Sequence, residues 1–179
     1  KTVILIQRAM KKVSFRNDVL PLKDILYRLA LRITLDSAEA EDIVQDTLIR
    51  IWNRREQWDE IENIEAFALT ICRNLALDRA EKQENNHLEL DEQRMERPDQ
   101  APTPLDHAQQ HDRIKLVRQL VDSLPEKQRS CVQLRDFEGK PYKEIADILG
   151  ITEQQVKVNI FRARQTIKQR FKQIDDYGL

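Results

Sequence analysis

The sequence predicts an all-α fold of two small helical domains joined by a flexible linker. Only 3 of its 179 residues are Gly and 6% are aromatic, a composition that favours helices over turn-rich sheets. Apolar residues recur at helical spacing in both halves of the chain. Between the halves, large apolar residues are few, and Pro98, Pro102 and Pro104 interrupt any helix. We therefore expect five segments: an N-terminal extension (1–19), a first domain (20–83), an acidic linker (84–110), a second domain (111–173) and a C-terminal tail (174–179).

Three amphipathic helices are expected in the first domain. Asp36 followed by Glu39 resembles a capping box, so the second helix should begin near Ser37. Asn63 is a suitable N-cap for the third helix, which should end near Gln83. The apolar stripes of the three helices start at Leu22, Ile43 and Ile64.

The second domain is expected to end in a helix-turn-helix. Pro125 suits the first turn of one helix, and a shorter helix over 142–149 follows. Gly150 suits the positive φ of a tight turn, and Thr152 caps a long final helix. Ala146 is small where the two helices must cross closely. This spacing is typical of a helix-turn-helix, although an ordinary helical hairpin with a solvated charged face is the alternative.

The charge distribution supports binding of nucleic acid at this end. The net charge is only −1. Between Ile151 and Lys172, however, six Lys or Arg residues stand against one Glu, so this segment carries +5 and the remainder −6. Residue types that contact base edges or phosphates lie on the expected exposed face: Gln154, Gln155, Lys157, Asn159 and Arg162.

Several classes of function are not indicated by the sequence. Cys72 and Cys131 lie in helical patterns without a CxxC spacing and should be buried free thiols. The three histidines lie in or beside the linker, without the Cys or carboxylate cluster of a metal site. No apolar run approaches the roughly 18 residues of a membrane span, and no phosphate-cradling Gly-rich loop is present. We expect no enzyme activity, cofactor, metal or membrane insertion.

Three stretches resemble a known family. AEDIVQDTLIRIW (40–52) and AFALTICRNLALDR (66–79) look like region 2 of bacterial sigma factors, and LPEKQR through YKEIA (124–146) looks like region 4. Two such blocks joined by a short linker form the layout of the extracytoplasmic-function (ECF, group 4) sigma factors of the sigma-70 family. The resemblance covers roughly residues 20–171. Val158-Asn159 stands where the family often has Ser-Arg, which leaves the −35 sequence undefined.

The resemblance implies a cytoplasmic initiation factor that binds core RNA polymerase, recognises −35 and −10 promoter elements and helps to melt the latter. It implies −35 contacts from Thr152, Gln154, Gln155, Lys157, Asn159, Phe161, Arg162 and Arg164. It implies −10 contacts from Trp58, Asn63, Asn74, Asp78 and Arg79. Docking on the β′ clamp helices is assigned to Asp42, Gln45, Asp46 and Arg50. In the family, the region around residues 124–137 sits on the β flap, and an anti-sigma factor is a frequent further partner.

Some of these roles have competing interpretations. From spacing alone, the polar face at Asp42–Arg50 would be interpreted as a helix face exposed to solvent. The resemblance to the family favours a polymerase-binding face instead. Trp52 lies on an apolar stripe and is expected in the core, whereas Trp58, beside Arg54 and Arg55, suits stacking on single-stranded DNA. In the family the linker threads the polymerase active cleft, and a passive tether is the alternative. A conventional helix-turn-helix regulator and a protein-interaction adaptor are the rival functions.

Overall fold

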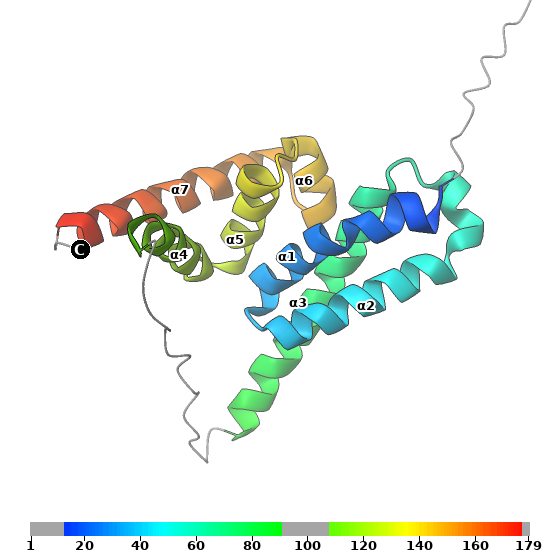
Figure 1. The fold of residues 1–179 in the computed structure, drawn as a ribbon, viewed down its shortest axis with the longest axis horizontal. Helices are drawn as coiled ribbons and strands as arrows, with labels where there is room; N and C mark the ends of the chain where they lie inside the picture. Colours follow the sequence, from blue (N-terminus) through cyan, green and yellow to red (C-terminus); the bar gives the residue numbers. More distant parts are fainter. Residues whose placement is uncertain (1–12, 91–107, 177–179) are drawn as a thin grey trace, which may run out of the picture.

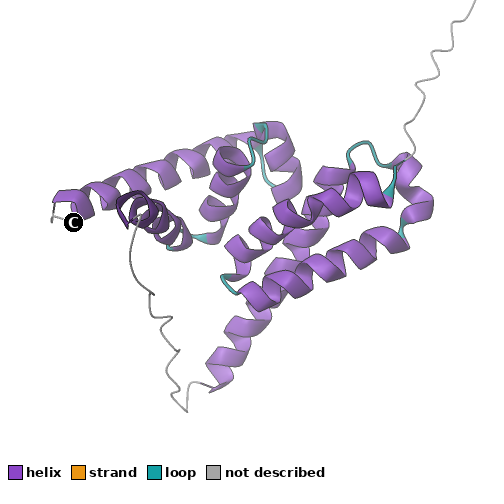
Figure 2. Cartoon of the chain, viewed as in Figure 1, coloured by secondary structure: helices purple, strands orange, loops and turns teal. Residues whose placement is uncertain are grey.

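The computed structural model describes residues 13–90 and 108–176, and every regular element in these ranges is helical (Figures 1 and 2). The first group of helices contains α1 (Lys23–Thr34), α2 (Ser37–Asn53) and α3 (Ile64–Leu90). The second contains α4 (Ala108–Asp122), α5 (Glu126–Val132), α6 (Tyr142–Leu149) and α7 (Glu153–Asp176). Short π or 3₁₀ turns complete the elements, at Phe15–Val19, Leu20–Leu22, Arg55–Glu60 and Gln133–Phe137.

The predicted helix caps are present. The Asp36 carboxylate accepts hydrogen bonds from the backbone N–H groups of Ala38 and Glu39, so α2 begins at Ser37 as expected. The Asn63 side chain accepts from Ala66 N at 3.0 Å and starts α3. Because these caps satisfy N–H groups that have no partner within the helix, they fix where each helix begins.

The helix boundaries beyond the first domain differ from the prediction. α3 does not end near Gln83 but continues to Leu90, into the stretch expected to be linker. Residues 83–90 contain no Pro or Gly, so nothing in them interrupts the helix. At its other end, the first group includes part of the expected extension, because Val19 is fully buried. α7 likewise runs into the expected tail, to Asp176. Residues 1–12 and 91–107, the rest of the extension and most of the linker, lie outside the described residues.

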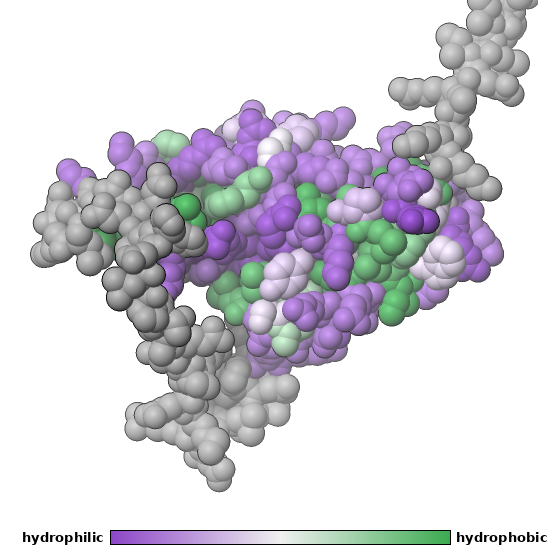
Figure 3. Space-filling view, viewed as in Figure 1, coloured by the Kyte–Doolittle hydropathy of each residue, from purple (hydrophilic) through white to green (hydrophobic). Residues whose placement is uncertain are grey.

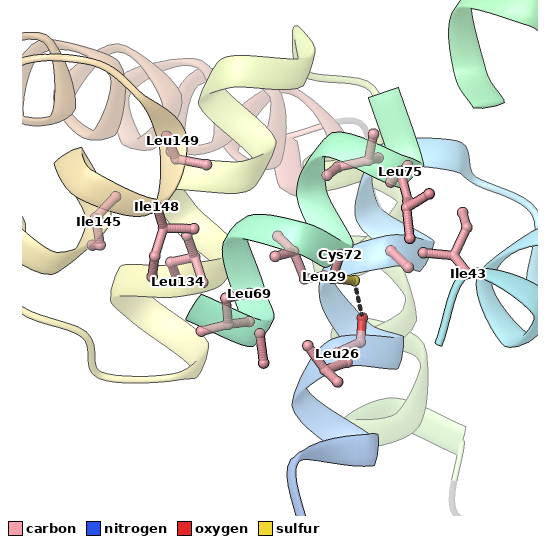
Figure 4. Packing of buried hydrophobic residues seen from close by; sticks show 14 of the residues in the cluster. Leu26, Leu29, Ile43, Leu69, Cys72, Leu75, Leu134, Ile145, Ile148 and Leu149 are labelled. Carbon is pink, nitrogen blue, oxygen red and sulfur yellow. Dashed lines mark hydrogen bonds between the residues drawn. The ribbon is translucent and has the colours of Figure 1, made fainter. Parts of the chain in front are cut away.

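The two groups of helices share one hydrophobic core. α3 packs on α1 and α2 with one side and on α6 with another, while α5 and the turn after it pack on α1. Leu69 of α3 therefore lies with Leu134, Ile145 and Ile148 of the second group in a single buried cluster (Figure 4). A smaller cluster, confined to the second group, consists of Val121, Leu124, Val132 and Ala163.

Ion pairs and charged hydrogen bonds join the same two groups. The Arg28 guanidinium donates to both carboxylate oxygens of Glu138, at 2.7 and 2.8 Å. Arg32 pairs with Asp122 and donates to the Gln133 side chain. Lys140 Nζ lies 2.6 Å from Glu65 Oε2. Burial alone would raise the pKa of Glu138, but hydrogen bonds from Arg28 and Gln133 bring it below its ordinary value.

Both cysteines are buried free thiols, as predicted. Cys72 Sγ donates to Leu26 O at 3.3 Å. Burial raises the pKa of each thiol from 9.0 to about 12. A thiol held in its neutral form is a weak nucleophile, so the fold protects both side chains from chemical attack.

The first prediction concerns these thiols. Neither should react with a thiol reagent at pH 8 until the chain is unfolded. Above pH 9 the folded chain keeps thiol protons that the unfolded chain loses. The contribution of the two buried thiols to the free energy of unfolding is therefore complete below pH 9. It is lost as the pH rises toward 12. The urea midpoint should fall between pH 8 and pH 10, and fall less in a variant with both cysteines changed to Ala. Rapid labelling of the folded chain would contradict the prediction.

The second prediction concerns the turn between α6 and α7. Gly150 has φ +61°, and a Cβ placed there would meet nothing within 4 Å. Gly150→Ala should therefore lower the free energy of unfolding by about 1 kcal/mol through backbone strain alone. Gly150→Asn should cost less, because Asn tolerates positive φ better. Equal losses for both variants in urea unfolding would show that strain is not the cause.

Candidate nucleic-acid interface

The helix-turn-helix is formed by α6 and α7. Val156 and Ile160 of α7 are buried against the rest of the molecule, and Ile151 N donates to Ala146 O at 3.1 Å across the turn. Thr152 and Gln155 form a reciprocal cap: Thr152 N donates to Gln155 Oε1, and Gln155 N donates to Thr152 Oγ1. These contacts fix α7 with its opposite face toward solvent.

The predicted −35 residues divide into two sets. Gln154, Lys157, Phe161 and Arg162 are exposed and have no hydrogen-bond or ion-pair partner among the described residues. Lys157 Nζ lies 5.9 Å from the centroid of the Tyr142 ring. Phe161 is 63% exposed, the largest exposed fraction among the large apolar side chains of the described residues. These four side chains form the free face of α7.

The other predicted −35 residues are engaged within the chain. Thr152 and Gln155 are used in the cap, and Asn159 Nδ2 donates to Gln155 O at 2.9 Å. Arg164 pairs with Asp136, and this hydrogen bond raises the pKa of Arg164. In this structure Arg164 therefore ties α7 to the turn at Gln133–Phe137.

Two of the predicted −10 residues of α3 lie on one side of that helix. Asn74 and Asp78 are exposed and one turn apart. Arg79 turns toward α2, where it pairs with Glu39 and Asp46. Asn63 lies at the start of the same helix, where its side-chain oxygen serves as the cap.

The burial of the two tryptophans is the reverse of the prediction. Trp58 is only 7% exposed, stacks on Phe15 and donates its indole N–H to Ile51 O at 3.1 Å. Trp52 is 46% exposed and lies under the Arg55 guanidinium, 5.2 Å from the ring centroid. The turn after α2 folds Trp58 back over the helix end, and helical periodicity carries no signal for such a position. The stacking role expected for Trp58 is therefore incompatible with this structure, and Trp52 offers the exposed ring.

The predicted polymerase-binding face of α2 is open. Asp42, Gln45 and Arg50 are exposed, and Asp46 is partly covered by its pair with Arg79. Ile49 lies among them and is 57% exposed. Ile49 was not among the residues predicted for this face. Its apolar side chain at a position on the polar side of the helix is the signal in the sequence that could have indicated it. Figure 3 shows apolar residues interspersed among polar ones on the visible face of the molecule.

A largely apolar groove of about 600 Å³ lies between α4, α5 and α7. Val132, Asp136 and Phe137 come from the segment that the resemblance assigns to the β flap. Val117, Ile167 and Phe171 line the opposite walls, with Lys168 and Lys172 also at the groove. The segment 124–137 therefore packs on α1 of the first group with one face and lines this groove with another.

Two further findings concern the described residues. No group of three or more His, Cys, Asp or Glu side chains in them could hold a metal ion. None of their helices combines the length and apolar character needed to cross a lipid bilayer.

Comparison with known proteins identifies the family. Residues 19–86 match the model "Sigma-70 region 2" and residues 114–167 match "Sigma-70, region 4". The chain is 30% identical over 145 residues to the ECF RNA polymerase sigma factor SigL of Mycobacterium tuberculosis. The aligned region covers 80% of this chain and 81% of SigL. It is 28% identical over 143 residues to the probable RNA polymerase sigma factor RfaY of Xanthomonas campestris, of which it spans only 36%.

Two solved structures share the fold. A sigma factor RpoE in complex with the anti-sigma factor NepR, from Bartonella quintana, has a TM-score of 0.72 at 23% identity, covering 88% of this chain and 96% of that one. CnrH in complex with the cytosolic domain of CnrY has a TM-score of 0.62 at 20% identity, covering 88% and 87%. With both region models matched in order and a relative of the same group matched over most of its length, the chain belongs to the ECF sigma factors of the sigma-70 family.

Proposed function

We propose that this chain is a transcription initiation factor, which binds core RNA polymerase in the cytoplasm and directs it to promoters. The observation that carries the proposal is the presence, in one chain of this family, of three separate exposed polar surfaces: the free face of α7, the Asn74–Asp78 side of α3 and the Asp42–Arg50 face of α2. The free face of α7 reads −35 duplex, Asn74 and Asp78 of α3 face the −10 strand, and the α2 face docks on the β′ clamp helices. The groove beside Phe137 receives the β flap.

The compact arrangement of the two groups has to open during this work. Positions −35 and −10 are separated by about 85 Å of straight B-DNA, at 3.4 Å per base pair. Three residues separate the end of α6 from the start of α7, and α6 packs on α3. A path along the 8 residues of α6 and half of the 27 residues of α3 is about 32 Å long, at 1.5 Å per residue. The compact chain therefore cannot contact the −35 and −10 promoter elements at the same time. Binding to polymerase must offset the free-energy cost of separating α3 from α6.

An anti-sigma factor is a further proposed partner. One of the two structural neighbours above is a complex with the anti-sigma factor NepR, and the other is a complex with the cytosolic domain of CnrY. A partner that stabilises the packing of α6 on α3 would keep the two DNA-facing surfaces too close together for promoter binding.

The third prediction tests polymerase binding. Asp42 is exposed and has no ion-pair partner among the described residues, so Asp42→Arg should weaken core binding about tenfold or more without loss of helicity. Asp46→Arg is less suitable, because it would bring a second cation against Arg79. Run-off transcription and core affinity provide the measurements.

Glu56→Arg makes the same charge change in the exposed turn after α2 and serves as the control. Wild-type protein that binds core no better than an unrelated protein does would refute the proposed function. Tight binding of the chain alone to promoter duplex would instead favour a conventional helix-turn-helix regulator.

The fourth prediction tests the free face of α7. In the complex with core, Lys157→Ala should weaken promoter binding and reduce the salt dependence by about one phosphate contact. Arg162→Ala should lower affinity about fivefold or more if it contacts a base edge. Arg164→Ala is the matched control and should affect stability more than binding, because its guanidinium is committed to Asp136. Loss of DNA affinity in the control alone would contradict the assignment.

A further inference from the structure

Arg79 lies where the polymerase-facing helix α2 meets the DNA-facing helix α3. Its Nη1 is 2.8 Å from Glu39 Oε2, and its Nη2 is 3.0 Å from Asp46 Oδ2. The guanidinium thus bridges two carboxylates that are two helical turns apart on α2. Its side chain is one-third exposed, so the bridge lies at the surface rather than in the core.

The bridge joins two surfaces with different proposed roles. Asp46 belongs to the α2 face that docks on polymerase, together with Asp42, Gln45 and Arg50. Arg79, itself a predicted −10 residue, follows Asp78 on α3 and lies about 100° around the helix from it. A single ion-pair triad therefore contains one side chain from each surface.

The triad also determines whether Arg79 can attract DNA. One guanidinium between two carboxylates leaves a local charge of −1, which repels a phosphate. Among the α3 cations whose side chains are described, Arg79 is the one paired with α2. Arg73 donates to Asn74, and Lys82 is exposed without an ion-pair partner in the described part of the chain. Of these α3 cations, Arg79 is thus the one that is held by acids of the proposed polymerase-facing helix.

We infer that Arg79 couples polymerase docking to −10 binding. In the free chain Glu39 and Asp46 hold its guanidinium, and docking of a cationic polymerase surface on Asp46 releases it toward the phosphates of the −10 strand. This inference rests on the proposed function, since it assigns the two partners that compete for the triad.

The coupling has a required reciprocity. If polymerase bound at Asp46 favours DNA at Arg79, then DNA at Arg79 must favour polymerase at Asp46 by the same factor. Partly exposed ion pairs change affinities by about two- to fivefold, so an effect of that size is expected for each acid. A factor that binds DNA poorly until it has docked would gain selectivity from such a device.

The test begins with the free chain. Affinity for a fluorescein-labelled mixed-sequence single-stranded DNA is measured by anisotropy at low salt. Glu39→Gln and Asp46→Asn should each raise affinity about two- to fivefold, and Arg79→Gln alone should change it less than twofold. The gain from the acid variants should vanish when Arg79→Gln is added. Glu41→Gln removes one exposed carboxylate from α2 that has no ion-pair partner among the described residues, and its effect should not depend on Arg79.

The second arm uses the complex with core polymerase on a promoter fragment that the wild-type complex transcribes. There Arg79→Gln should weaken promoter binding about fivefold or more, in contrast to its small effect in the free chain. Thermal unfolding by circular dichroism checks that each variant keeps its helices.

The outcomes separate the two proposals. If the acid variants raise affinity equally with and without Arg79, the effect is general electrostatics and the coupling is refuted. If Arg79→Gln has the same effect in the free chain and in the complex, the coupling is again refuted, while a transcribing wild-type complex leaves the proposed function intact. A wild-type chain that binds no core overturns the proposed function itself, whatever the free-chain results.

Discussion

Packing of α3 against three other helices is the interaction on which the rest of the structure depends. One side of α3 completes the core of the first group with α1 and α2, and Leu69 and its neighbours reach α6 in the second. The same helix presents Asn74 and Asp78 to solvent and directs Arg79 to α2. Its placement therefore sets the geometry of the proposed −10 surface, the α2 face and the contact between the two groups.

The contact between the groups combines an apolar centre with charged surroundings. Burial of residues such as Ile145 and Ile148 supplies a non-directional attraction, at about 25 cal/mol per Å² of apolar surface removed from water. The pairs Arg28–Glu138 and Lys140–Glu65 add little net free energy where they are exposed, but they select one orientation of the helices. An interface of this composition can hold the free chain closed and still yield to a larger partner.

The sequence was informative wherever the relevant interaction is local. Asp36, Asn63 and Gly150 each act within a few residues of their own position, so helix starts and the helix-turn-helix could be predicted from spacing. The candidate site was predictable in part for the same reason, since exposure of Asp42 or Lys157 follows from the helical period. The resemblance to a family supplied the partners that no local pattern contains.

The sequence did not indicate the contacts that only the tertiary structure creates. Trp58 is buried because the turn after α2 folds back onto Phe15, a contact made by residues more than forty positions apart. Arg79 and Arg164 look like free DNA-binding cations in the sequence, but their acid partners come from other helices. The packing of α6 on α3 joins segments that only the folded chain brings together. The helical periodicity of the sequence indicates none of these contacts, because it does not specify which distant segment a helix face meets.

The central claim is that the compact free chain opens when it docks on polymerase. The most direct measurement is the distance between two dyes, one on each group, in the free chain and in the transcribing complex. Ser37→Cys on α2 and Gln165→Cys on α7 provide exposed attachment points, while the native thiols stay buried. The account predicts efficient energy transfer in the free chain and a large loss of transfer on addition of core polymerase. Unchanged transfer in a complex that initiates transcription would contradict it.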